Sequence, residues 1–98
     1  MALMKAATKK QKRRFAKLQD LGCIICCREA EIHHCGTHMG GGRDHDKVIP
    51  LCPQHHRTYD PKGMSIHGNR KEFENLFGSE ELLMEKAERY LEEREERK

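Results

Sequence analysis

The chain has 98 residues, of which 36% are hydrophobic and 36% charged, with a formal net charge of +3 and no Trp, so it is long enough for one domain with a small core. No segment is apolar enough to span a membrane, and no apolar run follows the basic N-terminus as a secretory signal requires, so we expect a cytoplasmic protein without membrane contact. In a reducing compartment the five Cys are more typical of metal sites than of disulfides, and a metal would reinforce so small a core.

The first predicted element is a basic helix over residues 8–20, which Thr8 caps and Gly22 ends. Residues 5–17 contain seven basic residues and no acidic one. Such an arm either neutralises the phosphates of a nucleic acid or is a solvated terminal helix, and the charge run alone favours neither. The basic residues considered for phosphate contact are Lys9, Lys10, Lys12, Arg13 and Arg14, with Arg43 and Arg57 further along the chain.

Two short strands are predicted in the middle of the chain, around residues 31–34 and over 47–51, with a glycine-rich loop over 36–45 between them. Pro50 lacks a backbone N–H, so the second strand should lie at a sheet edge or end there. A short helix should follow from Pro53, which is favourable at a first helical position, to about Tyr59.

Two further helices are predicted in the C-terminal part. One covers residues 70–77 and is closed by Gly78, and the other begins after Ser79, which caps it. On the last helix Leu83, Ala87, Tyr90 and Leu91 form an apolar stripe that is typical of core packing. The chain beyond Leu91 is wholly charged, so we expect it to fray. The predicted organisation is an α+β domain over residues 23–91, an N-terminal arm over 1–22 and a charged tail over 92–98.

Two short-spaced pairs of ligand residues predict a structural zinc site. Cys23 and Cys26 form a CxxC pair, and Cys52 and His55 form a CxxH pair. Zinc prefers four tetrahedral nitrogen and sulfur ligands, which two such pairs supply with little backbone strain. The site would tie the two segments together and hold the strand–loop–strand between them in place.

Three histidines form a second constellation. On a strand His33 and His34 point to opposite faces, so one can face a metal while the other faces a water or a phosphate. His56 follows His55 on a helix, where neighbouring side chains diverge by about 100°. One of the two can therefore close the zinc site while the other faces His33. Phosphodiester cleavage needs a base with a pKa near neutral and a cation that offsets negative charge, and histidine supplies the first and binds the second.

Along the chain the motifs CxxC, IHH and IPLCxxHH follow one another, and GMSIHG and RKEFE lie downstream. This layout resembles the zinc-bearing branch of the HNH, or ββα-metal, endonucleases. Within that branch it is similar to the Ref-like recombination-enhancement nucleases of phages, which depend on RecA. The resemblance covers residues 23 to about 85. It implies a ββα-metal finger with a structural zinc knuckle, flanked by the N-terminal basic helix and the C-terminal helices. It also implies cleavage of DNA in a bacterial host with one divalent cation (Mg, Mn or Zn), and RecA-type filaments as a second partner.

The resemblance implies roles for individual residues. His34 matches the general base that activates water, and His33 and His56 match ligands of the catalytic metal. Asp46 stands near the position of the Asn in the family name; it can hydrogen-bond across the loop through its acceptor oxygens only, or help to bind the metal. His67 is a candidate for a further metal ligand or a supporting residue.

Several alternatives remain open at this point. Cys27 could replace Cys26 if the turn slipped by one residue, and Cys35 either serves a second metal or is buried. We expect His38 and His45, in the glycine-rich loop, to be solvated. The chain could instead be a non-catalytic zinc module that binds DNA, or a structural protein in which its Cys and His bind two zinc ions. RNA offers the same phosphate electrophile as DNA, so the motif does not separate the two.

Overall fold

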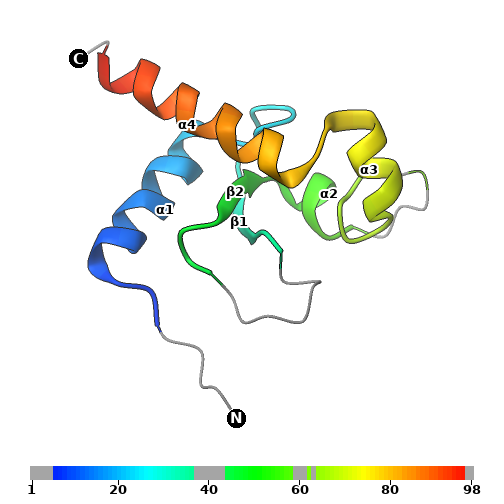
Figure 1. Cartoon of the computed structure of the whole chain (residues 1–98), viewed down its shortest axis with the longest axis horizontal. Coiled ribbons are helices and arrows are strands. Elements are labelled where there is room, and N and C mark those ends of the chain that lie inside the picture. Colours follow the sequence, from blue (N-terminus) through cyan, green and yellow to red (C-terminus); the bar gives the residue numbers. More distant parts are fainter. Residues whose placement is uncertain (1–5, 37–43, 59–61, 63, 97–98) are drawn as a thin grey trace.

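The computed structural model describes residues 6–36, 44–58, 62 and 64–96, which form a small α+β structure (Figure 1). None of the helices among these residues has the length and apolar character needed to cross a membrane. The elements in chain order are α1 (Lys9–Leu21), β1 (Glu31–His34), β2 (Val48–Leu51), α2 (Pro53–His56), α3 (Arg70–Phe77) and α4 (Glu80–Glu96).

The two strands form an antiparallel sheet at the centre of the molecule, with α1 and α4 to one side and α2 and α3 to the other (Figure 1). His33 pairs with Ile49 and His34 with Val48. Each strand of a two-stranded sheet has an outer edge, and there the carbonyl of Pro50 accepts a hydrogen bond from the Ile24 N–H at 2.9 Å. The prediction that Pro50 lies at a sheet edge is confirmed.

The helix α1 begins and ends as the sequence predicts. Thr8 and Gln11 form a reciprocal capping box in which each side chain accepts from the other residue's backbone N–H. Gly22 ends the helix at φ 91°, and a Cβ there would lie 2.7 Å from the carbonyl oxygen of Cys27. Only glycine therefore allows the chain to turn this closely into the cysteine-rich segment.

The helix α2 is shorter than predicted, since it ends at His56 rather than near Tyr59, which lies outside the described residues. Its carbonyl groups are taken by a later segment: the Ile66 N–H donates to the His55 carbonyl at 2.9 Å, and the His67 N–H to the His56 carbonyl at 3.1 Å. These carbonyls are the acceptors that a further helical turn would use. Tertiary pairing has thus replaced continuation of the helix.

The C-terminal helices follow the predicted boundaries except at the very end. Gly78 closes α3, and the Ser79 hydroxyl accepts from the Leu82 N–H at the start of α4. The sequence predicts fraying beyond Leu91, whereas the structure extends α4 to Glu96. Side-chain contacts with α1 accompany this extension: Lys17 binds Glu95 at 3.1 Å and Arg94 binds Asp20 at 3.0 Å. Tyr90 was expected in the core, but it is 37% exposed.

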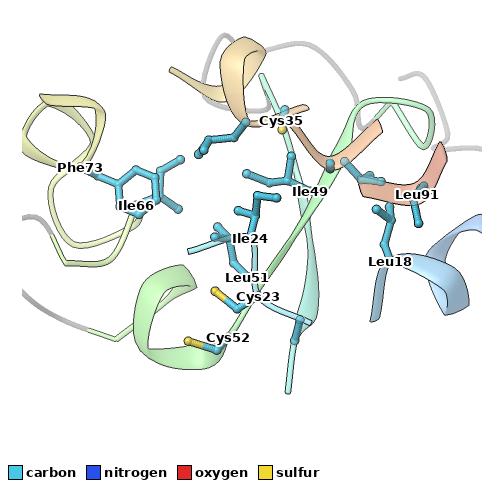
Figure 2. Close-up of a cluster of buried hydrophobic side chains, with 14 residues drawn as sticks. Leu18, Cys23, Ile24, Cys35, Ile49, Leu51, Cys52, Ile66, Phe73 and Leu91 are labelled. Atoms are coloured by element: carbon cyan, nitrogen blue, oxygen red, sulfur yellow. The ribbon is translucent and has the colours of Figure 1, made fainter. Parts of the chain in front are cut away.

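One cluster of buried side chains holds the layers together. It runs from Phe73 and Ile66, beside α2 and α3, through Leu51 and Ile49 of the sheet, to Leu18 of α1 and the neighbouring α4 (Figure 2). Leu18, Ile49, Leu51 and Phe73 are completely buried. Since α1 contributes Leu18 as its one fully buried residue, this side chain anchors the basic helix to the domain.

Replacement of Leu18 by Ala should lower the free energy of unfolding by about 2–5 kcal/mol, because it removes fully buried methyl groups and leaves a cavity. The measurement is denaturant unfolding with zinc present. Gln19→Ala, at the exposed neighbouring position, is the control and should change stability by less than about 0.5 kcal/mol. A Leu18→Ala loss no larger than that of the control would show that α1 is not anchored in this way.

Candidate active site

Three thiols meet at one end of the sheet. The Sγ atoms of Cys23, Cys26 and Cys52 all lie within 4.8 Å of one another, and those of Cys26 and Cys52 are 3.6 Å apart. Two of the cysteines belong to the turn before β1, and the third directly follows β2. Figure 2 shows the sulfur atoms of Cys23 and Cys52 close together at the margin of the core. The arrangement can hold a soft metal ion such as zinc.

The turn that carries Cys23 and Cys26 has backbone geometry suited to thiolate ligands. The Ile25 N–H donates to the Cys23 sulfur at 3.4 Å, and the Cys27 N–H donates to the Cys23 carbonyl at 2.8 Å. Burial raises the pKa of the Cys23 thiol to about 11, so a bound cation would be needed to keep it deprotonated near neutral pH. Cys27, the alternative to Cys26 as a ligand, is exposed and has a φ of 66°. It lies outside the thiol cluster, which contains Cys26.

His55, the predicted fourth zinc ligand, is buried beside this region. Its Nδ1 lies 2.6 Å from the Met64 carbonyl oxygen, which can only accept, so Nδ1 carries the proton. The lone pair of the neutral ring is then on Nε2, which is the tautomer that a metal ligand needs. Among the described residues, the group within 4.8 Å consists of the three thiols without His55. The fourth ligand therefore stays a prediction.

Three histidines form a second cluster. His33, His56 and His67 each offer a nitrogen within 4.8 Å of the others, and their ring centroids are 4.8–5.4 Å apart. They come from β1, from the end of α2 and from the turn before α3. The hydrogen bond between the His67 N–H and the His56 carbonyl brings the last two together, and buried Ser65 fixes the turn through its hydroxyl, which donates to the Thr58 carbonyl.

Two of these rings are oriented by carboxylates. His33 Nε2 lies 2.8 Å from Glu80, which also binds Arg70. Burial raises the pKa of Glu80, but the hydrogen bond from His33 and the charge of Arg70 outweigh burial and lower it to about 2. The ionised carboxylate can only accept, so His33 Nε2 donates this hydrogen bond, and Nδ1 is the ring nitrogen that Glu80 leaves unoccupied.

His56 is oriented in the same way by Glu31. Its Nδ1 lies 2.7 Å from Glu31 Oε1, which also accepts from Arg57 Nε at 2.7 Å. The hydrogen bond from Arg57 holds the pKa of Glu31 below its usual range, so the carboxylate accepts from His56 and leaves the lone pair on Nε2. A carboxylate behind each imidazole is a common arrangement behind metal-binding histidines.

The protonation of the cluster also suits metal binding. Burial lowers the pKa of His56, partly opposed by its bond to Glu31, and burial together with the neighbouring imidazoles lowers the pKa of His67. Both rings are therefore neutral at pH 7. His33 also lies near Cys35 and Glu80 in a buried group, but the Glu80 oxygens there already bind His33 and Arg70. The three-histidine cluster is the better candidate for a cation site.

His34 lies on the opposite face of β1, as predicted. Its Nε2 is 3.0 Å from Nδ1 of His45, and the edges of both rings contact Phe15 of α1 at centroid distances of 6.0 Å. His45 was expected to be solvated, but it is half-buried in this pair. His38 lies outside the described residues.

Asp46 is exposed and accepts a hydrogen bond from Gln11 Nε2 at 3.1 Å, so its carboxylate bridges the loop to α1.

The residues considered for phosphate contact have mixed surroundings. Four of them, on α1, are exposed: Lys9, Lys10, Lys12 and Arg13. Arg14 binds Glu88 of α4, and Arg57 binds Glu31. Arg43 lies outside the described residues. The phosphate-facing surface would thus be the exposed side of α1 rather than the side that faces α4.

The sequence interpretation missed the two carboxylates. Glu31 had a detectable signal, since it stands two residues before His33 and so shares its face of the strand. Glu80 lies 47 residues from His33, and its only local signal was a position in the first turn of a helix. Nothing in the sequence placed that turn against β1.

A family model described as "Recombination enhancement, RecA-dependent nuclease" matches residues 7–92. The chain belongs to this family. The match covers both clusters, β1 and β2, all of α1 and most of α4. A comparison with curated proteins gives no match. The family description names a nuclease that depends on RecA and enhances recombination, and a nuclease is an enzyme.

Replacement of Cys26 or Cys52 by Ser should lower the zinc content of the purified protein and its melting temperature, because each removes one of three converging thiols. Cys27→Ser is the matched control, since this exposed neighbour lies outside the cluster. The measurements are metal analysis of the purified protein and thermal unfolding. Equal zinc content in the Cys26→Ser and Cys27→Ser variants would contradict the assignment.

Proposed function

We propose that the chain is an HNH-type, metal-dependent endonuclease that hydrolyses phosphodiester bonds of DNA. The observation that carries this proposal is the convergence of His33, His56 and His67, two of them backed by ionised carboxylates. A non-catalytic zinc module that binds DNA gives no reason for this second cluster. The order β1, β2, α2 with the histidines on the first strand and on the helix also supports a ββα-metal site.

The three histidines would hold one divalent cation, for which Mg, Mn and Zn are the candidates. When bound, the cation supplies positive charge that offsets the negative charge on the phosphate and on the departing oxygen. Glu80 and Glu31 keep the His33 and His56 rings turned so that a lone pair of each is available. Imidazole ligands favour Mn or Zn, while bound phosphate oxygens and water would allow Mg.

His34 acts as the general base in this proposal. It takes a proton from water, and the resulting hydroxide oxygen attacks phosphorus in line with the leaving group. The bond between phosphorus and the 3′ oxygen breaks, the 3′ oxygen keeps the electron pair and takes a proton from solvent, and the products carry a 5′-phosphate and a 3′-hydroxyl.

The remaining features serve structure and substrate binding in this proposal. Cys23, Cys26, Cys52 and His55 form a structural zinc site that joins the ends of the sheet. Asp46 bridges the loop to α1 in place of the family's Asn. The exposed basic residues of α1 contact DNA phosphates, and a RecA filament is the second partner, as the family description suggests. The setting is recombination or DNA processing, with a phage or its bacterial host as the source.

His34→Ala should reduce the cleavage rate by about 10²–10⁴-fold without changing metal content, because it removes the base and leaves the cation ligands in place. His33→Ala should abolish both cleavage and binding of the exchangeable cation. The assay is nicking of circular DNA with Mg²⁺ or Mn²⁺, with and without RecA filaments. Cleavage by His34→Ala at the rate of the unmodified protein would overturn the base assignment, and no cutting of any DNA form by the unmodified protein would overturn the nuclease proposal.

Glu80→Gln should weaken binding of the catalytic cation about 10–100-fold, because an amide no longer fixes the His33 ring as an ionised acceptor does. Glu81→Gln is the matched control: it makes the same chemical change one residue further along α4, at an exposed position. The measurement is the Mn²⁺ concentration dependence of cleavage. Identical dependence for the two variants would show that Glu80 does not support the site.

A further inference from the structure

The face of β1 that carries His34 has its own arrangement of side chains, apart from the three-histidine cluster. His34 Nε2 and His45 Nδ1 are 3.0 Å apart, with ring planes at 72° and centroids 5.1 Å apart. Phe15 contacts both rings edge-on. At this distance the two nitrogens share one proton, so one ring must donate and the other accept.

The loop that carries His45 is held in place on several sides. The Asp46 N–H donates to the Asp44 side chain at 2.9 Å, and the Lys47 N–H donates to the Asp44 carbonyl at 3.0 Å. The Lys47 carbonyl accepts from the Cys35 N–H directly after β1, and Asp46 binds Gln11 of α1. His45 is therefore presented to His34 by a turn that is tied to both β1 and α1.

We propose that His45 is a positioning residue that fixes the orientation of the general base His34. This inference rests on the proposed function, because it concerns the residue that holds the base. The loop has no Asn at the position that the family name indicates, and in this proposal two of its other residues have defined roles. Asp46 anchors the loop to α1, and His45 contacts His34.

Three variants of His45 separate positioning from simple packing. Asn places an amide on Cγ, with a polar atom at the position of the His45 Nδ1, and should restore the bond. Gln places its amide one bond further out, at the position of Nε2, and Leu supplies no polar atom. We expect His45→Leu and His45→Gln to lower the single-turnover cleavage rate about 10–100-fold with KM for DNA within about twofold, and His45→Asn to stay within about fivefold of the unmodified protein.

The assay uses the full chain with RecA filaments, circular DNA and Mg²⁺ or Mn²⁺, after thermal unfolding and metal content have shown each variant to be folded and loaded. In a His34→Ala background, His45→Leu should cause no further loss, because the two residues act as a unit. Equal losses in the Asn and Leu variants, or an undiminished effect of His45→Leu without His34, would overturn the proposal. Full activity of His34→Ala alone would instead overturn the base assignment, so the two failures are distinguishable.

Discussion

The pairing of β1 with β2 is the interaction on which the other features depend. Four residue pairs fix the register, and the pleat then sends Glu31 and His33 to one face and His34 to the other. A slip of one residue would exchange these faces, so that His33 would meet Phe15 and His34 would meet Glu80. The strand pair is short, and a two-stranded sheet is marginal by itself. The thiols before β1 and after β2 close the sheet at one end, which is where a metal crosslink constrains the register most.

The helices add a second constraint, because they supply the partners of the histidines. Arg70 at the start of α3 and Glu80 at the start of α4 bind each other, and Glu80 reaches the buried His33. His67 is held against α2 by a backbone bond that also ends that helix. The three-histidine cluster therefore depends on the packing of α2, α3 and α4, since only His33 comes from the sheet. The buried polar contacts around the His33 imidazole, from Glu80 and through it Arg70, therefore connect the sheet to α3 and α4.

Local signals in the sequence predicted most elements correctly. The caps at Thr8 and Ser79 and the glycine stop at Gly78 act within a few residues, and so their effects can be read from the chain. The end of α2 and the extension of α4 to Glu96 were missed because tertiary contacts decide both. The same distinction applies to the site. The pattern CxxC with Cys52 predicted the thiol cluster, and strand alternation predicted that His33 and His34 diverge, whereas the contacts of Glu80 and His45 depend on long-range packing.

The central claim is that His33, His56 and His67 together bind one catalytic cation. The most direct measurement is a crystal structure of the zinc-loaded protein soaked in Mn²⁺, with the ions located by anomalous scattering. We expect a single Mn²⁺ bound by one nitrogen of each of the three rings, with Glu80 and Glu31 still hydrogen-bonded to His33 and His56. A cation held instead between His33, Cys35 and Glu80, or one that contacts none of the three rings, would contradict it.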